Sequence, residues 1–309
     1  MISLAALLLP LLLWDRGPET VDQLRRAQIR QIAVPLSLAE QWKAIKDMDV
    51  VPADPNQFIT VPVPSLTFNA QVSSATRAPW VNQNGWRFLR RPGGSYLYDT
   101  KSEGALLAAG EAFTYGVRAY IRADATELDA LGRMLAFLGG IPDRRMNPEV
   151  NIGFLDDGSP QSGEFMNLLV RRNLLFKVVP RPDPKLDLNV ALGEPDYPRV
   201  EASNPKLLAE KVRAHLTDEK RLLRVYGSEI VIGRLLGDRD AGRLFLINYG
   251  AAKSPVHGLR IRILGSYPKL HAVQYGNAPC QLTDILTGPD ATEFTLPELG
   301  TFATIDLGH

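Results

Sequence analysis

The sequence predicts an α/β protein that ends in an all-β part. Helix and strand patterns alternate up to residue 221, as in parallel sheets with right-handed crossovers. After Leu222 the hydrophobic period changes from about 3.6 residues to about 2, the period of half-buried strands. A length of 309 residues suits two domains or three small ones. With a polar linker at 142–148, three domains are expected, over 1–147, 148–221 and 222–309.

The first residues have two interpretations. Residues 2–14 (ISLAALLLPLLLW) form an apolar run as long as the core of a signal peptide and too short for a membrane-spanning helix. A signal peptide predicts a secreted or periplasmic protein, although no Lys or Arg precedes the run and no A-x-A site follows it. A buried strand has the same pattern and predicts a cytoplasmic protein. We expect export, with the end of the run also able to form a strand.

The rest of the first domain alternates helices and strands around one long interruption. A helix begins at Pro18, and a capping box at 37–40 (SLAE) begins the next one. Residues 55–94 are rich in Pro, Asn, Ser and Gly and predict an irregular or hairpin excursion, which at this length often has a function. The other expected elements are strands at 29–34, 49–51, 96–98 and 117–121 and helices at 102–115 and 124–138.

The middle domain has one clear βαβ unit. The strand at 150–155 is followed by Ser159, which is suited to cap the helix that begins at Pro160. A second strand is expected at 174–179 and a third at 186–192, and the last helix begins at Asn204-Pro205.

The C-terminal part reads as short antiparallel strands. Residues 259–263 (LRIRI) alternate strictly between aliphatic and charged side chains. Similar runs occur at 230–235, 244–248, 270–275, 293–296 and 301–307, with a hairpin loop at 237–242. Together with less regular runs, we expect seven or eight short strands after residue 222, which predicts a β-sandwich. Its expected core includes Ile230, Ile232, Leu244, Leu246, Ile261 and Ile263.

Composition excludes several classes of function. The formal net charge of +1 argues against a nucleic-acid-binding protein. The single cysteine, Cys280, excludes an intramolecular disulfide and a thiolate metal cluster. No metal and no cofactor are expected, because none of the four histidines has metal-ligand spacing: His215, His257, His271 and His309. Carboxylates are the groups that remain for catalysis.

Three segments resemble parts of bacterial glycoside hydrolases of the β-galactosidase type. They are VNIGFLDDGSPQSGEFMNLLVRRNLLFKVV, EIVIGRLLGDRDAGRLFLINYG and ATEFTLPELGTFATIDL. The resemblance implies a catalytic (β/α) barrel, then a flavodoxin-like, glutamine-amidotransferase-like domain, then a β-sandwich. A full barrel needs about 250 residues, so the unit over 1–147 is expected to be a reduced barrel.

The resemblance also implies a role for the middle domain. In the glycosidases this domain typically serves packing or assembly, which predicts a homo-oligomer formed through it. Cys-His amidotransferase chemistry is not expected, because the turn after VNIGFL reads Asp156-Asp157-Gly158-Ser159 and Cys280 lies in the predicted sandwich. Asp156 and Asp157 are interpreted as turn and helix-capping residues.

Four aspartates follow predicted strands of the first domain. In a barrel such positions face the active site, and glycoside hydrolysis needs a pair of carboxyl groups. Asp54 and Asp124 fit the role of turn and cap residues better. Asp15 and Asp99 are therefore the candidate catalytic residues. The sequence leaves open whether the protein is an active enzyme.

Trp80, Trp86, Arg87 and Tyr98 are the candidate substrate-binding residues. They lie in 80–98 (WVNQNGWRFLRRPGGSYLY), where aromatic rings suit stacking on sugars and polar groups suit their hydroxyls. Alternatively, the tryptophans and Phe88 anchor the loop, and the arginines are solvated or pair with Asp99. The function predicted is that of a glycoside-hydrolase-like protein that acts on or binds carbohydrate. The alternatives are a non-catalytic assembly or cell-surface interaction protein, and a cytoplasmic α/β enzyme of another class.

Overall fold

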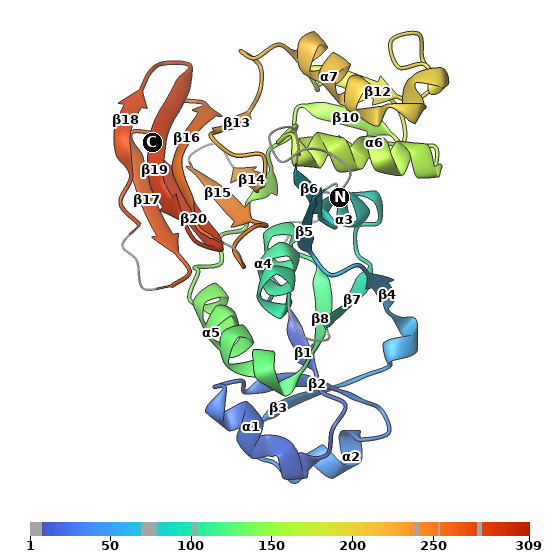
Figure 1. The fold of residues 1–309 in the computed structure, drawn as a ribbon, viewed down its shortest axis with the longest axis vertical. Coiled ribbons are helices and arrows are strands. Elements are labelled where there is room, and N and C mark those ends of the chain that lie inside the picture. The colour runs from blue at the N-terminus through green and yellow to red at the C-terminus, as the bar shows by residue number, and fades with distance from the viewer. Residues whose placement is uncertain (1–7, 69–78, 101–103, 238–240, 253, 277–279) are drawn as a thin grey trace. The chain divides into compact units, whose positions relative to one another are not determined.

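A computed structural model describes residues 8–68, 79–100, 104–237, 241–252, 254–276 and 280–309 (Figure 1). The chain forms two compact units. Unit 1 consists of Met1–Ser65, Asn82–Asn84 and Arg91–Arg145, and unit 2 consists of Leu66–Val81, Gly85–Arg90 and Met146–His309. Two segments expected in the first domain, 66–81 and 85–90, thus belong to unit 2.

The described part of unit 1 is built on a six-stranded parallel sheet of order β3-β2-β1-β8-β7-β4. The strands are β1 (Leu11–Leu13), β2 (Gln31–Pro35), β3 (Asp49–Ala53), β4 (Ile59–Val61), β7 (Ser95–Thr100) and β8 (Arg118–Ala123). The helices are α1 (Val21–Arg26), α2 (Ala39–Trp42), α4 (Ala105–Tyr115) and α5 (Leu128–Gly139), with one-turn helices η1 (Pro18–Thr20), η2 (Pro55–Gln57) and η3 (Ala125–Glu127).

The end of the first apolar run is a central strand. Leu12 and Leu13 of β1 are fully buried between β2 and β8. The strand interpretation thus holds for Leu11–Leu13, whereas residues 1–7 lie outside the described residues. Among the residues that the structure describes, no helix is both long and apolar enough to cross a membrane. Export remains a prediction.

The strand order of unit 1 is cyclic. The first strand of this sheet in the sequence, β1, pairs with the last, β8. Each of the other pairs joins two strands of the sheet that follow each other in the sequence. The strands β3 and β4 also follow each other in the sequence, but they lie at the two edges of the sheet. The connection from Ala53 to Ile59 spans at most about 21 Å when extended. The edges of a flat six-stranded sheet lie about 24 Å apart, and the chain must also return to the amino end of the next strand. The sheet is therefore curved, with β3 and β4 brought toward each other.

The face that carries Leu97 and Tyr120 has its own hydrophobic cluster. Leu13, Ala33, Ala53, Leu97 and Tyr120 form this cluster, and Leu11 and Phe58 pack against it. The Phe58 ring stacks on Tyr120, with centroids 4.0 Å apart and planes 9° apart. Because Phe58 immediately precedes β4, this contact reaches across β7 to β8, as expected for a curved sheet.

Of two expectations for the first predicted domain, one was wrong and the other holds only in part. Ser37 does not cap a helix, since Leu38 occupies the N-cap position of α2 without a side-chain cap bond. The helix has four residues, and its buried Trp42 donates from Nε1 to the carbonyl of Arg16 at 3.0 Å. The excursion 55–94 also contains a strand of the parallel sheet, β4, and a helix, α3 (Gly85–Arg90). Its hairpin is β5 (Ser65–Phe68) with β6 (Pro79–Asn82).

Unit 2 contains a second parallel sheet, of order β11-β10-β12 in the described residues. Its strands are β10 (Ile152–Leu155), β11 (Phe176–Val178) and β12 (Leu188–Ala191), and its helices are α6 (Pro160–Arg171), η4 (Arg199–Ser203) and α7 (Pro205–Leu216). Ser159 caps α6 as expected, because its Oγ accepts from the amide of Ser162 at 3.1 Å. The flavodoxin-like assignment of this segment remains a prediction.

The C-terminal strands form two antiparallel sheets. Their order is β13-β16-β19-β18 in one and β17-β20-β15-β14-β9 in the other, for the strands that the structure describes. The strands are β9 (Asn147–Pro148), β13 (Leu223–Tyr226), β14 (Val231–Gly237), β15 (Ala241–Asn248), β16 (Val256–Leu264), β17 (Lys269–Gln274), β18 (Thr283–Thr287), β19 (Ala291–Leu299) and β20 (Phe302–Gly308). Half of the predicted hairpin loop 237–242, namely residues 238–240, lies outside the described residues.

One hydrophobic cluster joins residues of both antiparallel sheets. Leu259, Ile261 and Ile263 of β16 are fully buried in it, as the alternation at 259–263 predicts. One expected core position, Ile230, was wrong. Ile230 is only partly buried, whereas Ile232 is buried as predicted but lies outside this cluster, to which its neighbour Val231 belongs. A mixed α/β chain with parallel and antiparallel sheets is thus confirmed, whereas the sandwich assignment remains a prediction.

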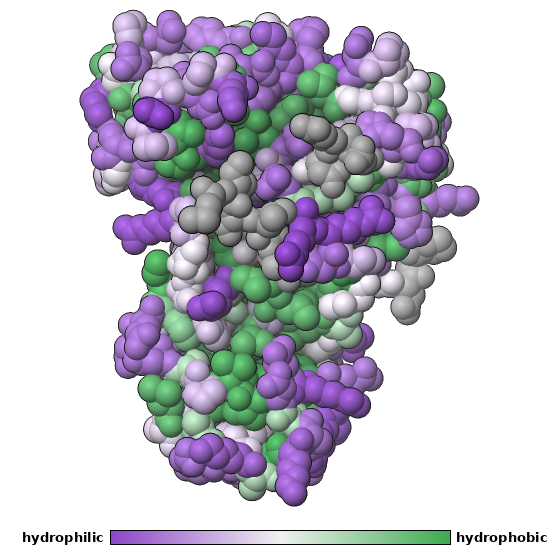
Figure 2. Space-filling view, turned by 180° about the vertical axis from the view of Figure 1, so that it is seen from behind, coloured by the Kyte–Doolittle hydropathy of each residue, from purple (hydrophilic) through white to green (hydrophobic). Residues whose placement is uncertain are grey.

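Hydrophobic residues also reach the surface, where Figure 2 shows them mixed with hydrophilic ones on one face of the molecule. Val200, Leu286 and Leu36 are the most exposed large hydrophobic residues in the described ranges. Exposed apolar residues that occur singly are normal in soluble proteins, and we assign no role to these three.

Candidate functional site

Three charged side chains lie together at the carboxyl edge of the parallel sheet of unit 1. Asp15 follows β1, Arg122 is near the end of β8, and Asp99 is near the end of β7, on three strands that are neighbours in the sheet (Figure 1). Asp99 is directly opposite Arg122 in the strand register. The long-range pairing of the first strand with the last brings Asp15 to the same place.

The same face of the sheet carries these residues and the hydrophobic cluster below them. Side chains two residues apart point to one face of a strand. Asp99 is two residues after Leu97, and Arg122 is two residues after Tyr120. Asp15 follows Leu13 by the same interval. The three charged groups therefore form the next layer above the apolar one.

Arg122 joins the two candidate carboxylates. Its Nη1 donates to Oδ2 of Asp99 at 3.2 Å, and its Nε lies 3.3 Å from Oδ2 of Asp15. These distances and the width of a guanidinium place the two carboxyl oxygens within about 9 Å of each other. The side chains of Asp15 and Asp99 are 49% and 41% exposed, so both are accessible to solvent.

This arrangement offers two kinds of chemistry. Carboxylates accept and a guanidinium donates hydrogen bonds, which suits the hydroxyl groups of a sugar. A pair of carboxyl groups at this separation also fits glycoside hydrolysis, where one gives a proton to the leaving group and the other attacks or activates water. Since Arg122 contacts both carboxylates, the one that acts as the acid must first leave Arg122.

The other two aspartates of the edge have the predicted local roles in part. Asp54 Oδ1 accepts from the amide of Asn56 at 3.1 Å, as a turn residue does. Asp124 occupies the N-cap position of η3, but its exposed side chain makes no cap hydrogen bond. Glu127 is the carboxylate that links β7 to the start of α4 at this edge. It accepts from Thr100 Oγ1 and from the amide of Ala105, both at 2.9 Å.

Tyr98 does not face solvent. Its ring is fully buried, and its hydroxyl donates to Oε2 of the buried Glu111 at 2.7 Å. Burial raises the pKa of Tyr98 well above its ordinary value, and the adjacent Glu111 carboxylate raises it further. Asn84 donates to the same carboxylate from its amide at 2.7 Å and from its side chain at 2.9 Å. Tyr98 thus joins a buried network and leaves no ring face for a sugar.

The other three candidate binding residues belong to unit 2. Trp80 on β6 is 40% exposed. Trp86 on α3 is half-buried under the guanidinium of Arg87, 4.3 Å from its ring centroid. A Cβ at Gly163 would lie 2.8 Å from Trp86, so this tryptophan packs closely on α6 and supports the loop-anchoring alternative. Phe88 is likewise buried.

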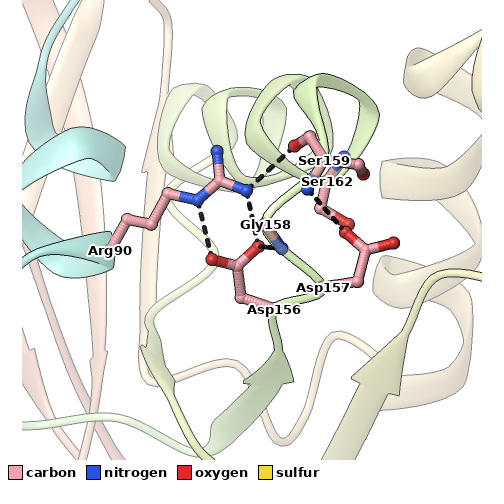
Figure 3. A network of polar contacts seen from close by, with 6 residues as sticks. All are labelled: Arg90, Asp156, Asp157, Gly158, Ser159 and Ser162. Carbon is pink, nitrogen blue, oxygen red and sulfur yellow. Dashed lines mark hydrogen bonds and ion pairs between the residues drawn. The ribbon is translucent and has the colours of Figure 1, made fainter.

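The turn after β10 in unit 2 is occupied by ion pairs (Figure 3). Arg90 donates to both oxygens of Asp156 at 2.7 Å, and its Nη2 also donates to the carbonyl of Ser159 at 2.9 Å. Asp157 accepts from the Ser159 amide at 2.9 Å and from Arg199 Nη2 at 2.5 Å. Arg90 was a predicted partner for Asp99, but it binds Asp156, while Arg122 binds Asp99.

Asp157 should give a pH-dependent contribution to stability. Burial alone would raise the pKa of its carboxyl, but hydrogen bonds from Ser159 and Arg199 outweigh burial and hold the pKa well below its ordinary value. The contribution is therefore complete above about pH 5 and is lost as the pH falls below about 4. Asp157→Asn should lower the free energy of unfolding by about 1 kcal/mol at pH 7 and by less at pH 3, measured by urea denaturation. Equal losses at both values would contradict this.

No group of three or more His, Cys, Asp or Glu residues in the described ranges is arranged to hold a metal ion. Cys280 is partly buried, and burial raises the pKa of its thiol to about 11, which does not suit a nucleophile. The prediction that the protein uses no metal and no cofactor remains a prediction.

No family model and no curated protein matches the sequence. Among solved structures, α-L-fucosidase isoenzyme 2 from Paenibacillus thiaminolyticus has a similar fold, with a TM-score of 0.53 at 7% identity over 70% of this chain. The chain spans 61% of the length of that fucosidase. A GH30 endoxylanase from Clostridium papyrosolvens covers 97% of this chain and 95% of its own, at 7% identity, but its TM-score of 0.23 carries no argument.

The fucosidase comparison concerns the fold alone, because the identity is so low. It shows that the fold over 70% of this chain is similar to that of the fucosidase. The resemblance to the β-galactosidase type in particular remains a prediction.

Proposed function

We propose that this protein acts on carbohydrate at the carboxyl edge of the parallel sheet of unit 1, with Asp15 and Asp99 as its acidic pair. One observation carries the proposal. The two aspartates selected from the sequence lie at the carboxyl ends of β1 and β7, on either side of β8, and both are partly exposed and in contact with Arg122. The glycoside-hydrolase-like fold supports the choice of carbohydrate as the substrate class.

We further propose that the sheet of unit 1 is a reduced (β/α) barrel. The cyclic strand order, the short link between β3 and β4 and the stacking of Phe58 on Tyr120 support this interpretation. In a barrel the carboxyl edge is where active sites lie. The position of the acidic pair, one layer above the apolar cluster, is the position that a barrel enzyme uses for its reacting groups.

In this proposal each group has a defined task. Sugar hydroxyls replace part of the Arg122 contacts and accept from its guanidinium. One aspartic acid protonates the glycosidic oxygen, and the other carboxylate attacks the anomeric carbon or activates a water molecule. Arg122 thus binds the sugar and also holds the second carboxylate. Glu127 supports Arg122 and Asp99 through Thr100, whose hydroxyl also lies 3.0 Å from the carbonyl of Arg122.

The test is hydrolysis of a panel of p-nitrophenyl glycosides, including the α-L-fucoside, the β-xyloside and the α-glucoside. Asp15→Asn and Asp99→Asn should each lower kcat/KM about 100-fold or more, because a positioned acid or base contributes about 10²–10⁴. Asp124→Asn is the matched control, since this aspartate lies at the same edge without a cap bond. It should change kcat/KM less than twofold.

The same experiment rejects the proposal if the parent neither hydrolyses nor binds any glycoside of the panel, or if both asparagine variants retain the parent's rate. The assembly alternative predicts the first of these results. If the parent binds a glycoside without hydrolysing it, and the Asp15 and Asp99 variants bind it more weakly, then the carbohydrate site is retained and the catalytic role is rejected. A homo-oligomer formed through 148–221 remains a separate prediction, to be measured by light scattering.

A further inference from the structure

Trp80 has an exposed ring on a strand whose next residue is fully buried. Val81 points into the protein, so the alternation of β6 turns Trp80 outward. With 40% of its surface exposed, this ring is not a core anchor. The sequence left core anchoring and ligand contact open for both tryptophans, and exposure separates Trp80 from Trp86.

Arg171, at the end of α6, holds this ring in place. Its guanidinium carbon lies 4.0 Å from the centroid of the Trp80 ring, in a cation–π contact. Its Nη2 donates to the carbonyl of Pro79 at 3.0 Å, directly before Trp80 in the chain. One side chain from another element therefore binds both the ring and its backbone. A ring fixed in this way loses little freedom when a ligand stacks on it.

We propose that Trp80, supported by Arg171, is a second sugar-binding platform, on unit 2 and separate from the acidic pair of unit 1. The C–H groups on the flat face of a pyranose are weakly positive and stack on the negative face of an indole. The Arg171 cation covers one face of the ring, so in this proposal the sugar stacks on the opposite face. This inference rests on the proposed function, because it takes carbohydrate as the ligand class.

The charge beneath the ring makes the platform selective. A cation on one face opposes a second cation on the other, so lysine side chains and quaternary ammonium groups are poor ligands. Neutral sugars carry no full charge, so this penalty is much smaller for them. A neutral oligosaccharide therefore fits this surface better than a basic peptide does.

The test measures binding of cellohexaose, xylohexaose and maltohexaose to the full chain by calorimetry. It is done in the Asp15→Asn/Asp99→Asn background, so that the probes are not hydrolysed. At least one hexasaccharide should bind, and Trp80→Ala should weaken it about tenfold or more. Trp80→Phe should retain most of the affinity, since it keeps a ring. Arg171→Met should weaken binding a few-fold, because it removes the support and keeps the aliphatic stem.

Phe68→Ala is the matched control, because Phe68 is 41% exposed on the neighbouring strand β5. Its affinity should stay within twofold of the parent. Binding of none of the three hexasaccharides, or equal losses in the Phe68 and Trp80 variants, would overturn the platform. Tighter binding of choline than of the sugars would also overturn it. Because hydrolysis is measured separately through Asp15 and Asp99, the platform and the proposed function can fail independently.

Discussion

Arg90→Met is expected to lower the free energy of unfolding of unit 2 by about 3–5 kcal/mol, the cost of leaving a buried charge without its partner. The side chains of Arg90 and Asp156 are only 16% and 13% exposed, and they form a two-pronged ion pair. Arg90 also supplies a donor to the carbonyl of Ser159 at the start of α6. Urea denaturation followed by circular dichroism measures the change.

Two further variants identify the cause of this loss. Arg213→Met breaks another arginine–aspartate pair of the same unit. The side chains of this pair, Arg213 and Asp218, are 47% and 38% exposed. This variant should cost at most about 1 kcal/mol. Adding Asp156→Asn to Arg90→Met should recover part of the stability, because it removes the unpaired charge. If Arg90→Met costs no more than Arg213→Met, burial of the pair does not stabilise this turn.

Ile261→Ala is expected to cost about 2–5 kcal/mol, because truncation leaves a cavity in a close-packed core. Ile261 has no exposed surface, and it lies between Val225 of β13 and Phe294 of β19 in the cluster that both antiparallel sheets share. Thermal and urea unfolding of unit 2 should both show the loss.

His257→Ala on the same strand is the control for Ile261. Its side chain is mostly exposed, and its contact with Glu298 lies at the surface. This variant should stay within about 0.5 kcal/mol of the parent. A similar small change for Ile261→Ala would mean that β16 does not face the shared core.

The local patterns of the sequence predicted local structure well. Ser159 caps α6 and Pro160 begins it. The alternation at 259–263 correctly gives the buried face of β16. It failed for β14, where Ile232 and Val231 are both buried. Alternation identifies the core side of a strand only when the other side meets water, and neither side of this part of β14 does.

The candidate site was predicted in part. Asp15 and Asp99 were selected because each follows a strand, but four aspartates met that rule. The strand order decided among them, because β1 and β7 are both neighbours of β8. Arg122, which joins them, had no signal in the sequence beyond its place near a strand end. Pairing between strands about 100 residues apart is a long-range property that no local pattern contains.

The sequence by itself determined the alternation of helices and strands, the change of period after Leu222 and the cap of α6, since these depend on neighbouring residues. Only the tertiary structure decided which strands lie side by side. It thereby placed Arg122 between Asp15 and Asp99, buried Tyr98 against Glu111 and left Trp80 exposed on Arg171. Such contacts depend on residues brought together from distant parts of the chain, and burial depends on everything that packs around a side chain.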